Sequence, residues 1–171
     1  MQVSKISHLS SRYPALLQEI KPLPKDLYVL GDLPSEPTLA IVGTRRPSQY
    51  GRDITYRLAS ELAEAGLVIV SGLAYGLDAV AHRAALDVGG KTIAVLANGL
   101  DQVYPTAHRE LAAEILASGG ALISEQPIGT PPFKQHFAAR NRIISGLSLG
   151  VLVTEAAAKS GTLITAEFAA N

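Results

Sequence analysis

The sequence predicts an α/β fold of the Rossmann type, in which helices cover both faces of a doubly wound parallel sheet. From Thr38 onward, short apolar runs alternate five times with longer segments of helical periodicity. The apolar runs contain few polar residues, which is typical of parallel strands that are buried on both faces. We therefore expect an extended Rossmann-like sheet with strand order 3-2-1-4-5.

The expected elements follow one another in a regular order. Strands are expected at 39–42, 67–70, 92–96, 121–123 and 150–153. Helices are expected near 52–65, 78–88, 106–118 and 139–147, with a fifth that starts near Gly161. Glycines at 66, 89–90 and 119–120 stand where helices should end.

The first 37 residues differ from the rest in pattern. Five prolines interrupt them, so we expect residues 1–37 to form an irregular appendage that packs on a main domain of residues 38–171. Within the appendage, Tyr13–Ile20 could form a short helix and Leu27–Leu30 a short strand.

Composition narrows the class of protein. Hydrophobic residues make up 47% of the 171 residues, which indicates a globular chain with a real core. The chain has no cysteine and no clustered histidines and carboxylates at ligand spacing, so we expect neither a disulfide nor a metal site. No segment has the pattern of a signal peptide or a membrane span. We expect a cytoplasmic protein without a membrane partner.

Charge is balanced over the whole chain but not along it. Fifteen basic and fifteen acidic residues give a formal net charge of zero. Two windows, 37–52 and 126–154, nevertheless contain basic residues and no Asp or Glu. The second window also contains Phe137. Positive charge with an aromatic ring suits a single-stranded polyanion, because phosphates need cations and bases stack on rings. A solvated basic loop and a core position for Phe137 are the alternatives.

The loops that should follow the strands are rich in Gly, Ser, Thr and Arg. Ligands of Rossmann-like sheets bind at the carboxyl edge of the strands, so we expect Gly43, Gly72, Gly99, Glu125 and Glu155 to meet there. Candidates for phosphate contact are Gly43 and Thr44 in the first loop, Ser71, Gly72 and Gly76 in the second, and Ser160, Gly161 and Thr162 before the last helix. Plain turns and an ordinary helix start are the alternatives.

Two features of these loops limit the chemistry. The first loop lacks the G-x-G-x-x-G pattern, since Arg45 and Ser48 occupy two of the glycine positions, so we expect no NAD or other cofactor. Asp78 suits the N-cap of the helix after the second loop. His82 follows one turn later, and we interpret the two residues as a pair that positions the helix rather than a catalytic pair.

Several segments together resemble the DprA (Smf) family of DNA-processing proteins. They occur in family order from about residue 38 to the end. The segments are Val42-Gly43-Thr44-Arg45, residues 71–82, Asn98-Gly99-Leu100-Asp101 with Tyr104-Pro105, Ser124-Glu125, Phe137 with residues 140–144, and Glu155 with Ser160-Gly161-Thr162. Ala97 and Ala138 replace residues that the family often has as Gly and Pro.

The resemblance implies an extended Rossmann domain that binds single-stranded DNA. It also implies that the domain of residues 38–171 is incomplete at its C-terminus. It implies RecA recombinase as a partner, which family members load on incoming strands during natural transformation, and it implies a possible homodimer. The family's DNA contacts correspond to residues in the two acid-free windows. The DNA-binding residues expected here are Arg45, Arg46, Lys134, Phe137, Arg140, Asn141 and Arg142.

An enzyme of the same fold is the main alternative. The lonely-guy phosphoribohydrolases share the fold and have the signature P-G-G-x-G-T-x-x-E. Alignment on Gly161-Thr162 puts Thr165 where that signature has its catalytic Glu, so we expect no such activity. A sensor of a nucleotide-derived signal is a further alternative, although it would not need the long basic window around Lys134.

Overall fold

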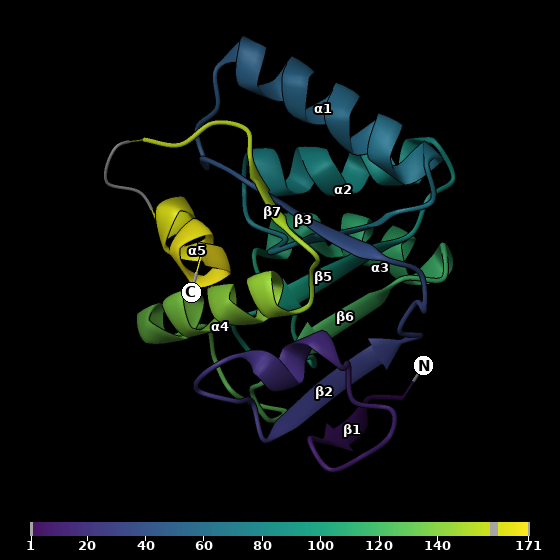
Figure 1. The fold of residues 1–171 in the computed structure, drawn as a ribbon, viewed down its shortest axis with the longest axis vertical. Coiled ribbons are helices and arrows are strands. Elements are labelled where there is room, and N and C mark those ends of the chain that lie inside the picture. Colours follow the sequence, from purple (N-terminus) through teal and green to yellow (C-terminus); the bar gives the residue numbers. More distant parts are fainter. Residues whose placement is uncertain (1, 158–160, 171) are drawn as a thin grey trace.

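The structure is a computed structural model that describes residues 2–157 and 161–170. In those residues one mixed sheet contains seven strands in the order β1-β2-β6-β5-β4-β3-β7 (Figure 1). The strands are β1 (Ser4–Ser7), β2 (Asp26–Gly31), β3 (Thr38–Val42), β4 (Val68–Ser71), β5 (Thr92–Leu96), β6 (Ala121–Ser124) and β7 (Val151–Val153). The helices are η1 (Leu16–Glu19), α1 (Gln49–Glu64), α2 (Leu77–Asp87), η2 (Thr106–His108), α3 (Arg109–Ala117), α4 (Lys134–Gly146) and α5 (Gly161–Ala170).

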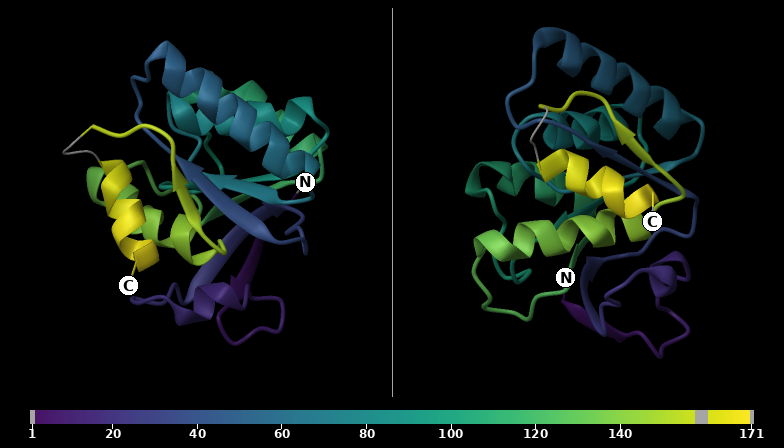
Figure 2. Two further views of the ribbon diagram at one scale, coloured as in Figure 1. Left: turned by 45° about the horizontal axis from the view of Figure 1, so that its top comes forward. Right: turned by 60° about the vertical axis from the view of Figure 1, so that its left-hand side comes forward.

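Helices cover both faces of the sheet, which confirms the predicted α/β class. Alternate residues of a strand point to opposite faces, and β3 shows both environments. Ala40 and Val42 join a buried cluster with Ile143 of α4, whereas Ile41 joins one with Ala59 of α1 and Ala81 of α2. In Figures 1 and 2, α4 and α5 accordingly lie across the sheet from α1 and α2.

The predicted strand order, 3-2-1-4-5, is wrong. The fourth predicted strand, β6, pairs in parallel with β5 rather than with β3, and Leu122 lies opposite Ala94. The five predicted strands therefore run 4-3-2-1-5. Right-handed crossovers explain the helix layers. The chain steps in one direction from β3 to β6, which leaves α1, α2 and α3 on one face, and it reverses only after β6, which carries α4 to the other.

The first 37 residues are more regular than expected. Strands β1 and β2 extend the sheet beyond β6 in antiparallel pairing, with Val29 opposite Ile123. The predicted strand is confirmed inside β2, but β1 was not predicted, because its four residues include one buried apolar side chain. The predicted helix at 13–20 is a single turn, η1. Leu17 and Leu27 are fully buried, so this segment contributes to the core.

The start of α4 also differs from the prediction. The apolar periodicity indicated a helix near 139–147, whereas α4 begins at Lys134, directly after Pro131, Pro132 and Phe133. Its first three residues, Lys134, Gln135 and His136, are polar, and such a start gives no periodic signal. This difference matters because it puts Lys134 and Phe137 on a helix rather than in a loop. No helix in the described residues is long and apolar enough to cross a membrane.

Five parallel strands end at a common edge of the sheet. Strands β4, β3 and β7 are parallel neighbours, as are β4, β5 and β6. The segments that contain Gly43, Gly72, Gly99, Glu125 and Glu155 follow these strands, so the predicted shared edge is confirmed. A direct contact joins two of the segments, because the amide of Thr44 donates to the carbonyl of Glu155 at 2.8 Å.

Candidate nucleic-acid interface

A pocket of about 680 Å³ opens at this edge, between the loop after β3 and the helices α4 and α5. It brings together residues from both acid-free windows and from the segment before the C-terminus. The predicted site residues that line it are Gly43, Thr44, Arg45, Arg46, Lys134, Phe137, Arg140, Asn141 and Thr162.

The loop after β3 is held from behind and presents its two arginines to solvent. Besides the bond from Thr44 to Glu155, the hydroxyl of Thr162 donates to the carbonyl of Gly43 at 3.1 Å. The hydroxyl of Thr44 accepts the amide of Arg46 at 3.2 Å. A Cβ at Gly43 would overlap Leu77, so the close packing of this loop on α2 requires glycine. Arg45 and Arg46 are exposed at the pocket rim.

Phe137 is neither a core residue nor a fully exposed one. Its half-buried ring lies edge-on to Tyr104, with 5.7 Å between centroids. The guanidinium carbons of Arg45 and Arg140 lie 5.5 and 5.9 Å from the ring centre, within the range of cation–π attraction. Lys134, three residues earlier on α4, is exposed. The pocket thus combines an aromatic ring with several cations.

Arg140 is the most buried cation of the pocket. Its Nη1 donates to the carbonyls of Gly72 and Val95, both at 2.6 Å, and its Nε donates to Asn141 at 3.2 Å. Burial lowers the pKa of Arg140 to about 10, and the nearby Asp78 carboxylate opposes that shift. The side chain therefore fastens α4 to the ends of β4 and β5 and supplies fixed positive charge behind Phe137.

Asp78 does not cap its helix as predicted. The N-cap of α2 is Gly76, at φ 80°, and Asp78 lies in the first turn. Its buried carboxylate reaches back and accepts the amides of Gly72 and Ala74 at 3.1 and 3.4 Å. Burial raises the pKa of Asp78, while Arg140 and the backbone amides lower it. A Cβ at Gly72 would collide with Arg140, so glycine is required where these groups meet.

Arg142 lies outside the pocket. It is buried, and its Nη2 pairs with Glu125 at 2.6 Å, its Nε donates to the carbonyl of Pro22 at 2.9 Å and its Nη1 to that of Ala139 at 2.7 Å. Two residues from Arg140, it points in another direction because helical neighbours at this spacing do not share a face. Arg142 therefore holds the N-terminal segment against α4 and does not line the pocket.

The remaining predicted phosphate-loop residues are spread over several places. The buried hydroxyl of Ser71 donates to the carbonyl of Ile41 at 2.7 Å, which leaves it inside the sheet. Gly76 packs behind Arg45, where a Cβ would overlap the backbone. Gly161 begins α5, and Ser160 lies outside the described residues.

Glu155 forms the N-terminal cap structure of α1 together with Ser48. Its Oε1 and Oε2 accept the amide of Ser48 at 3.1 and 3.2 Å, and Oε2 also accepts the Ser48 hydroxyl at 2.6 Å. The Ser48 hydroxyl in turn accepts the amide of Gly51 at 3.0 Å. The hydrogen bonds from Ser48 lower the pKa of Glu155. Both carboxylate oxygens are thus committed to a structural role.

Sequence reasoning missed several residues of the pocket wall. Tyr104, Pro132 and Thr165 line it with Asp78. The sequence shows Tyr104 only as part of a family-like segment. Neither charge nor hydrophobic periodicity marks an exposed aromatic residue after a strand as part of a binding site. Thr165 reaches the pocket from α5 and is 1% exposed.

Comparison with known proteins decides the family. The family model for DNA recombination-mediator protein A matches residues 4–171, nearly the whole chain. The chain belongs to the DNA recombination-mediator protein A family. Protein Smf of Escherichia coli (strain K12) is a curated member, 49% identical over 162 residues that cover 94% of this chain and 43% of the Smf chain.

Solved structures of family members have the same fold. DNA processing protein A of Streptococcus pneumoniae matches with a TM-score of 0.92 at 45% identity, covering 99% of this chain and 60% of that one. A second structure concerns the single-stranded DNA binding mode of DNA processing protein A from Helicobacter pylori. It matches with a TM-score of 0.85 at 37% identity. The match covers 98% of this chain and 76% of the H. pylori chain. The chain spans less than half the length of E. coli Smf.

Proposed function

We propose that this chain binds single-stranded DNA as the DNA-binding part of a recombination mediator. The observation that carries the proposal is the position of the Phe137 ring near the guanidinium groups of both Arg45 and Arg140, in a pocket that Lys134 also lines. A single strand offers phosphates to the cations and unpaired bases to the ring. The H. pylori relative, which binds single-stranded DNA, supports the choice of ligand.

The local charge of the pocket favours a polyanion. Among the described residues that line the pocket, the only acid is Asp78, which is 5% exposed and accepts two backbone amides. Arg45, Arg46 and Lys134 are exposed and make no ion pair with a carboxylate in the described part of the chain. Their charge is therefore available to phosphates, although the chain as a whole is neutral.

The cellular role that we propose follows the family resemblance. The protein acts in the cytoplasm, protects incoming strands during natural transformation, helps to load RecA recombinase on them and forms a homodimer. The support for this role is membership of a family of DNA recombination mediators. Co-sedimentation of RecA with strand-bound protein, and sedimentation equilibrium of the free protein, would test the two partners separately.

We also propose that the protein is not a phosphoribohydrolase. Thr165 stands where that class has its catalytic Glu, and Thr165 is 1% exposed. Glu155, one of the carboxylates near the carboxyl edge, is bonded through both oxygens to Ser48. A general base must reach the proton that it removes, and neither side chain meets this requirement.

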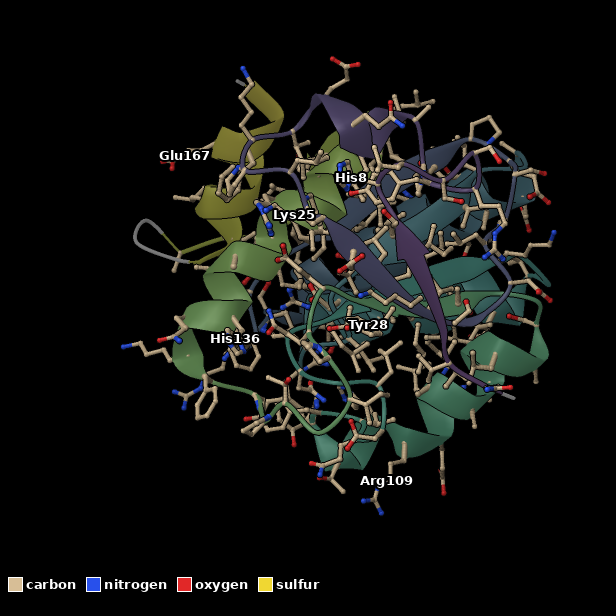
Figure 3. All side chains as sticks on the ribbon, turned by 90° about the horizontal axis from the view of Figure 1, so that it is seen from below. His8, Lys25, Tyr28, Arg109, His136 and Glu167 are labelled. Carbon is tan, nitrogen blue, oxygen red and sulfur yellow. The ribbon has the colours of Figure 1, made fainter. Side chains whose placement is uncertain are left out.

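Fluorescence anisotropy with a labelled oligo-dT strand tests DNA binding directly. Arg45→Gln should weaken binding, because it removes both a phosphate contact and the cation beside Phe137. The matched control is Arg109→Gln, because Arg109 is exposed, projects from α3 and does not line the pocket (Figure 3). Equal affinities for the two variants would contradict the proposal.

A further inference from the structure

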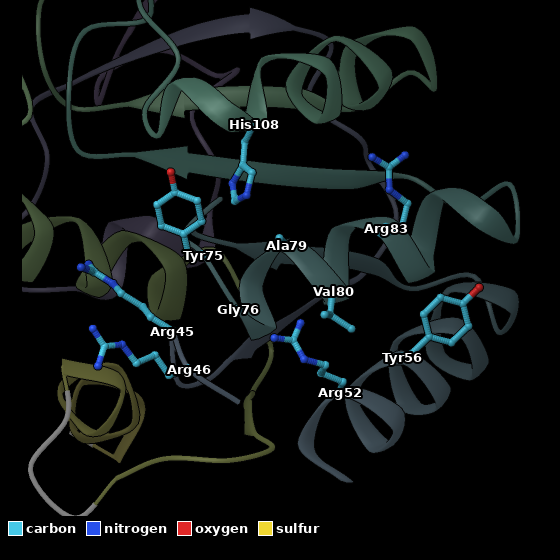
Figure 4. Close-up of a pocket in the computed structure, with 10 residues that line it drawn as sticks. All are labelled: Arg45, Arg46, Arg52, Tyr56, Tyr75, Gly76, Ala79, Val80, Arg83 and His108. Atoms are coloured by element: carbon cyan, nitrogen blue, oxygen red, sulfur yellow. The ribbon is translucent and has the colours of Figure 1, made fainter. Parts of the chain in front are cut away.

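A second pocket, of about 740 Å³, lies beside the first, and Figure 4 shows the residues that line it. Arg45 and Arg46 line both pockets, so the two form one continuous surface. The second pocket has the start of α2 as its floor and the first half of α1 as a wall. In Figure 4, Arg45, Arg46 and Arg52 lie on one side of the opening, and Tyr75 and His108 lie on the other.

The charge of this second pocket matches that of the first. No Asp or Glu is among its lining residues. Arg52, on the first turns of α1, is exposed and makes no ion pair with a described carboxylate. Arg83, at the far end, is neutralised by Glu114. Uncompensated positive charge therefore continues from the first pocket across Arg45 and Arg46 to Arg52 and stops near Arg83.

The second pocket also has an aromatic ring that is held in place but open to solvent. Tyr75 is 51% exposed, and its ring lies edge-on to His108, with 5.1 Å between centroids. His108 is itself fixed, because its Nδ1 lies 2.8 Å from the carbonyl of Leu73. A supported ring loses little side-chain entropy when it binds, and an exposed tyrosine face is suited to stacking on a base.

We propose that a single strand bound at Phe137 continues over Arg45 and Arg46 into this second pocket. There Arg52 binds a phosphate and Tyr75 stacks on a base. The proposal rests on the proposed function, and it adds the path that the strand takes over the surface and a longer binding site. A strand fits better than a free nucleotide, because the two pockets share their central cations and repeat the same pairing of cations with a ring.

Strand length separates this proposal from the proposed function. Labelled oligo-dT strands of about 4 and about 16 nucleotides bracket the site sizes of single-strand-binding folds. Tyr75→Ala should lower the affinity for the longer strand about fivefold or more. Arg52→Gln should lower the salt slope of binding to the longer strand by about 0.7. Both variants should bind the shorter strand with little change. Tyr75→Phe should bind as wild type. Tyr50→Ala and Arg12→Gln are controls, since both residues are exposed and line neither pocket.

Each outcome has a definite meaning. If Tyr75→Ala and Arg52→Gln bind the longer strand as wild type while Lys134→Gln binds it weakly, the second pocket is not part of the path and the proposed function stands. Equal losses on both strand lengths would also overturn the extension. Binding of dTMP that Tyr75→Ala abolishes, with unchanged strand affinity, would show a separate nucleotide site instead. If Lys134→Gln has no effect either, the proposed function itself fails.

Discussion

The guanidinium carbon of Arg45 lies 5.5 Å from the centre of the Phe137 ring, although the two residues come from opposite ends of the domain's sequence. Arg45 follows β3, which lies between β4 and β7 in the sheet, and Phe137 lies on α4, which crosses the sheet from β6 to β7. The fold thus joins the two acid-free windows into one site.

Phe137→Ala should weaken strand binding without changing the number of phosphate contacts. Lost base stacking should cost about 1–3 kcal/mol of binding free energy, while the slope of log affinity against log salt stays nearly constant. Anisotropy titrations at several salt concentrations measure both quantities. Phe133→Ala is the matched control, because Phe133 is 54% exposed and outside the pocket lining. If the loss of affinity only follows a fall in melting temperature, the ring is a core residue.

How far the sequence predicted this site depends on the kind of signal. Charge windows and glycine positions depend on composition, so the pocket residues Arg45 and Lys134 could be found without a structure. The direction in which a side chain points could not be predicted from the sequence. Arg140 and Arg142 are two residues apart, yet one lines the pocket and the other pairs with Glu125, and only the rotation of α4 separates them.

The fold was predictable to a similar degree. The strands β3 to β7 have a clear apolar pattern, and their shared carboxyl edge follows from parallel pairing. The strand order was wrong because sequence pattern does not show after which strand a doubly wound sheet reverses. Strand β1 was not predicted, because a short antiparallel edge strand needs few apolar residues.

Arg142→Gln should lower stability and leave the DNA site intact. The change removes the charge partner of Glu125 and bonds to two carbonyls, so the free energy of unfolding should fall by about 2 kcal/mol. The salt slope of strand binding should not change. Chemical denaturation and salt-dependent titrations on the same variant measure the two effects. A slope lower by about 0.7 would instead assign Arg142 a phosphate contact.

His82 should make the protein less stable as pH falls below neutral. Its ring is fully buried, with Nδ1 2.7 Å from the Thr92 hydroxyl, and burial lowers its pKa from 6.5 to about 3. Below pH 6.5 the unfolded chain therefore binds a proton that the folded chain does not. Stability should fall by up to about 1.4 kcal/mol per pH unit.

The pH window distinguishes His82 from the carboxylates. Glu36 and Glu155 have pKa values lowered from 4.5, so their stabilising effect is lost only below pH 4.5. Asp78 is the exception, because burial raises its pKa. The contribution of His82 is therefore measured as the difference between wild type and His82→Gln in denaturation curves from about pH 7 to about pH 5. His82→Gln should reduce the pH dependence there. An unchanged dependence in that variant would show that His82 takes up its proton over the same pH range in the folded and the unfolded chain.

Incubation with AMP should release no free adenine, because neither Thr165 nor Glu155 can act as the general base. Chromatography of the reaction mixture measures the product. Glu155→Gln serves as the control for contamination, since a contaminating enzyme would act equally in both preparations. Adenine release by the wild type that Glu155→Gln abolishes would replace the binding function with catalysis.

The salt dependence of oligo-dT binding tests the central claim most directly, with Lys134→Gln compared to the wild type. Lys134 is exposed at the pocket rim on the first turn of α4, so its loss should leave the melting temperature unchanged. If the pocket holds the phosphates of a single strand, the variant should bind more weakly and its salt slope should be lower by about 0.7. Wild-type binding that does not depend on salt, or a variant with the wild-type slope and affinity, would contradict the account.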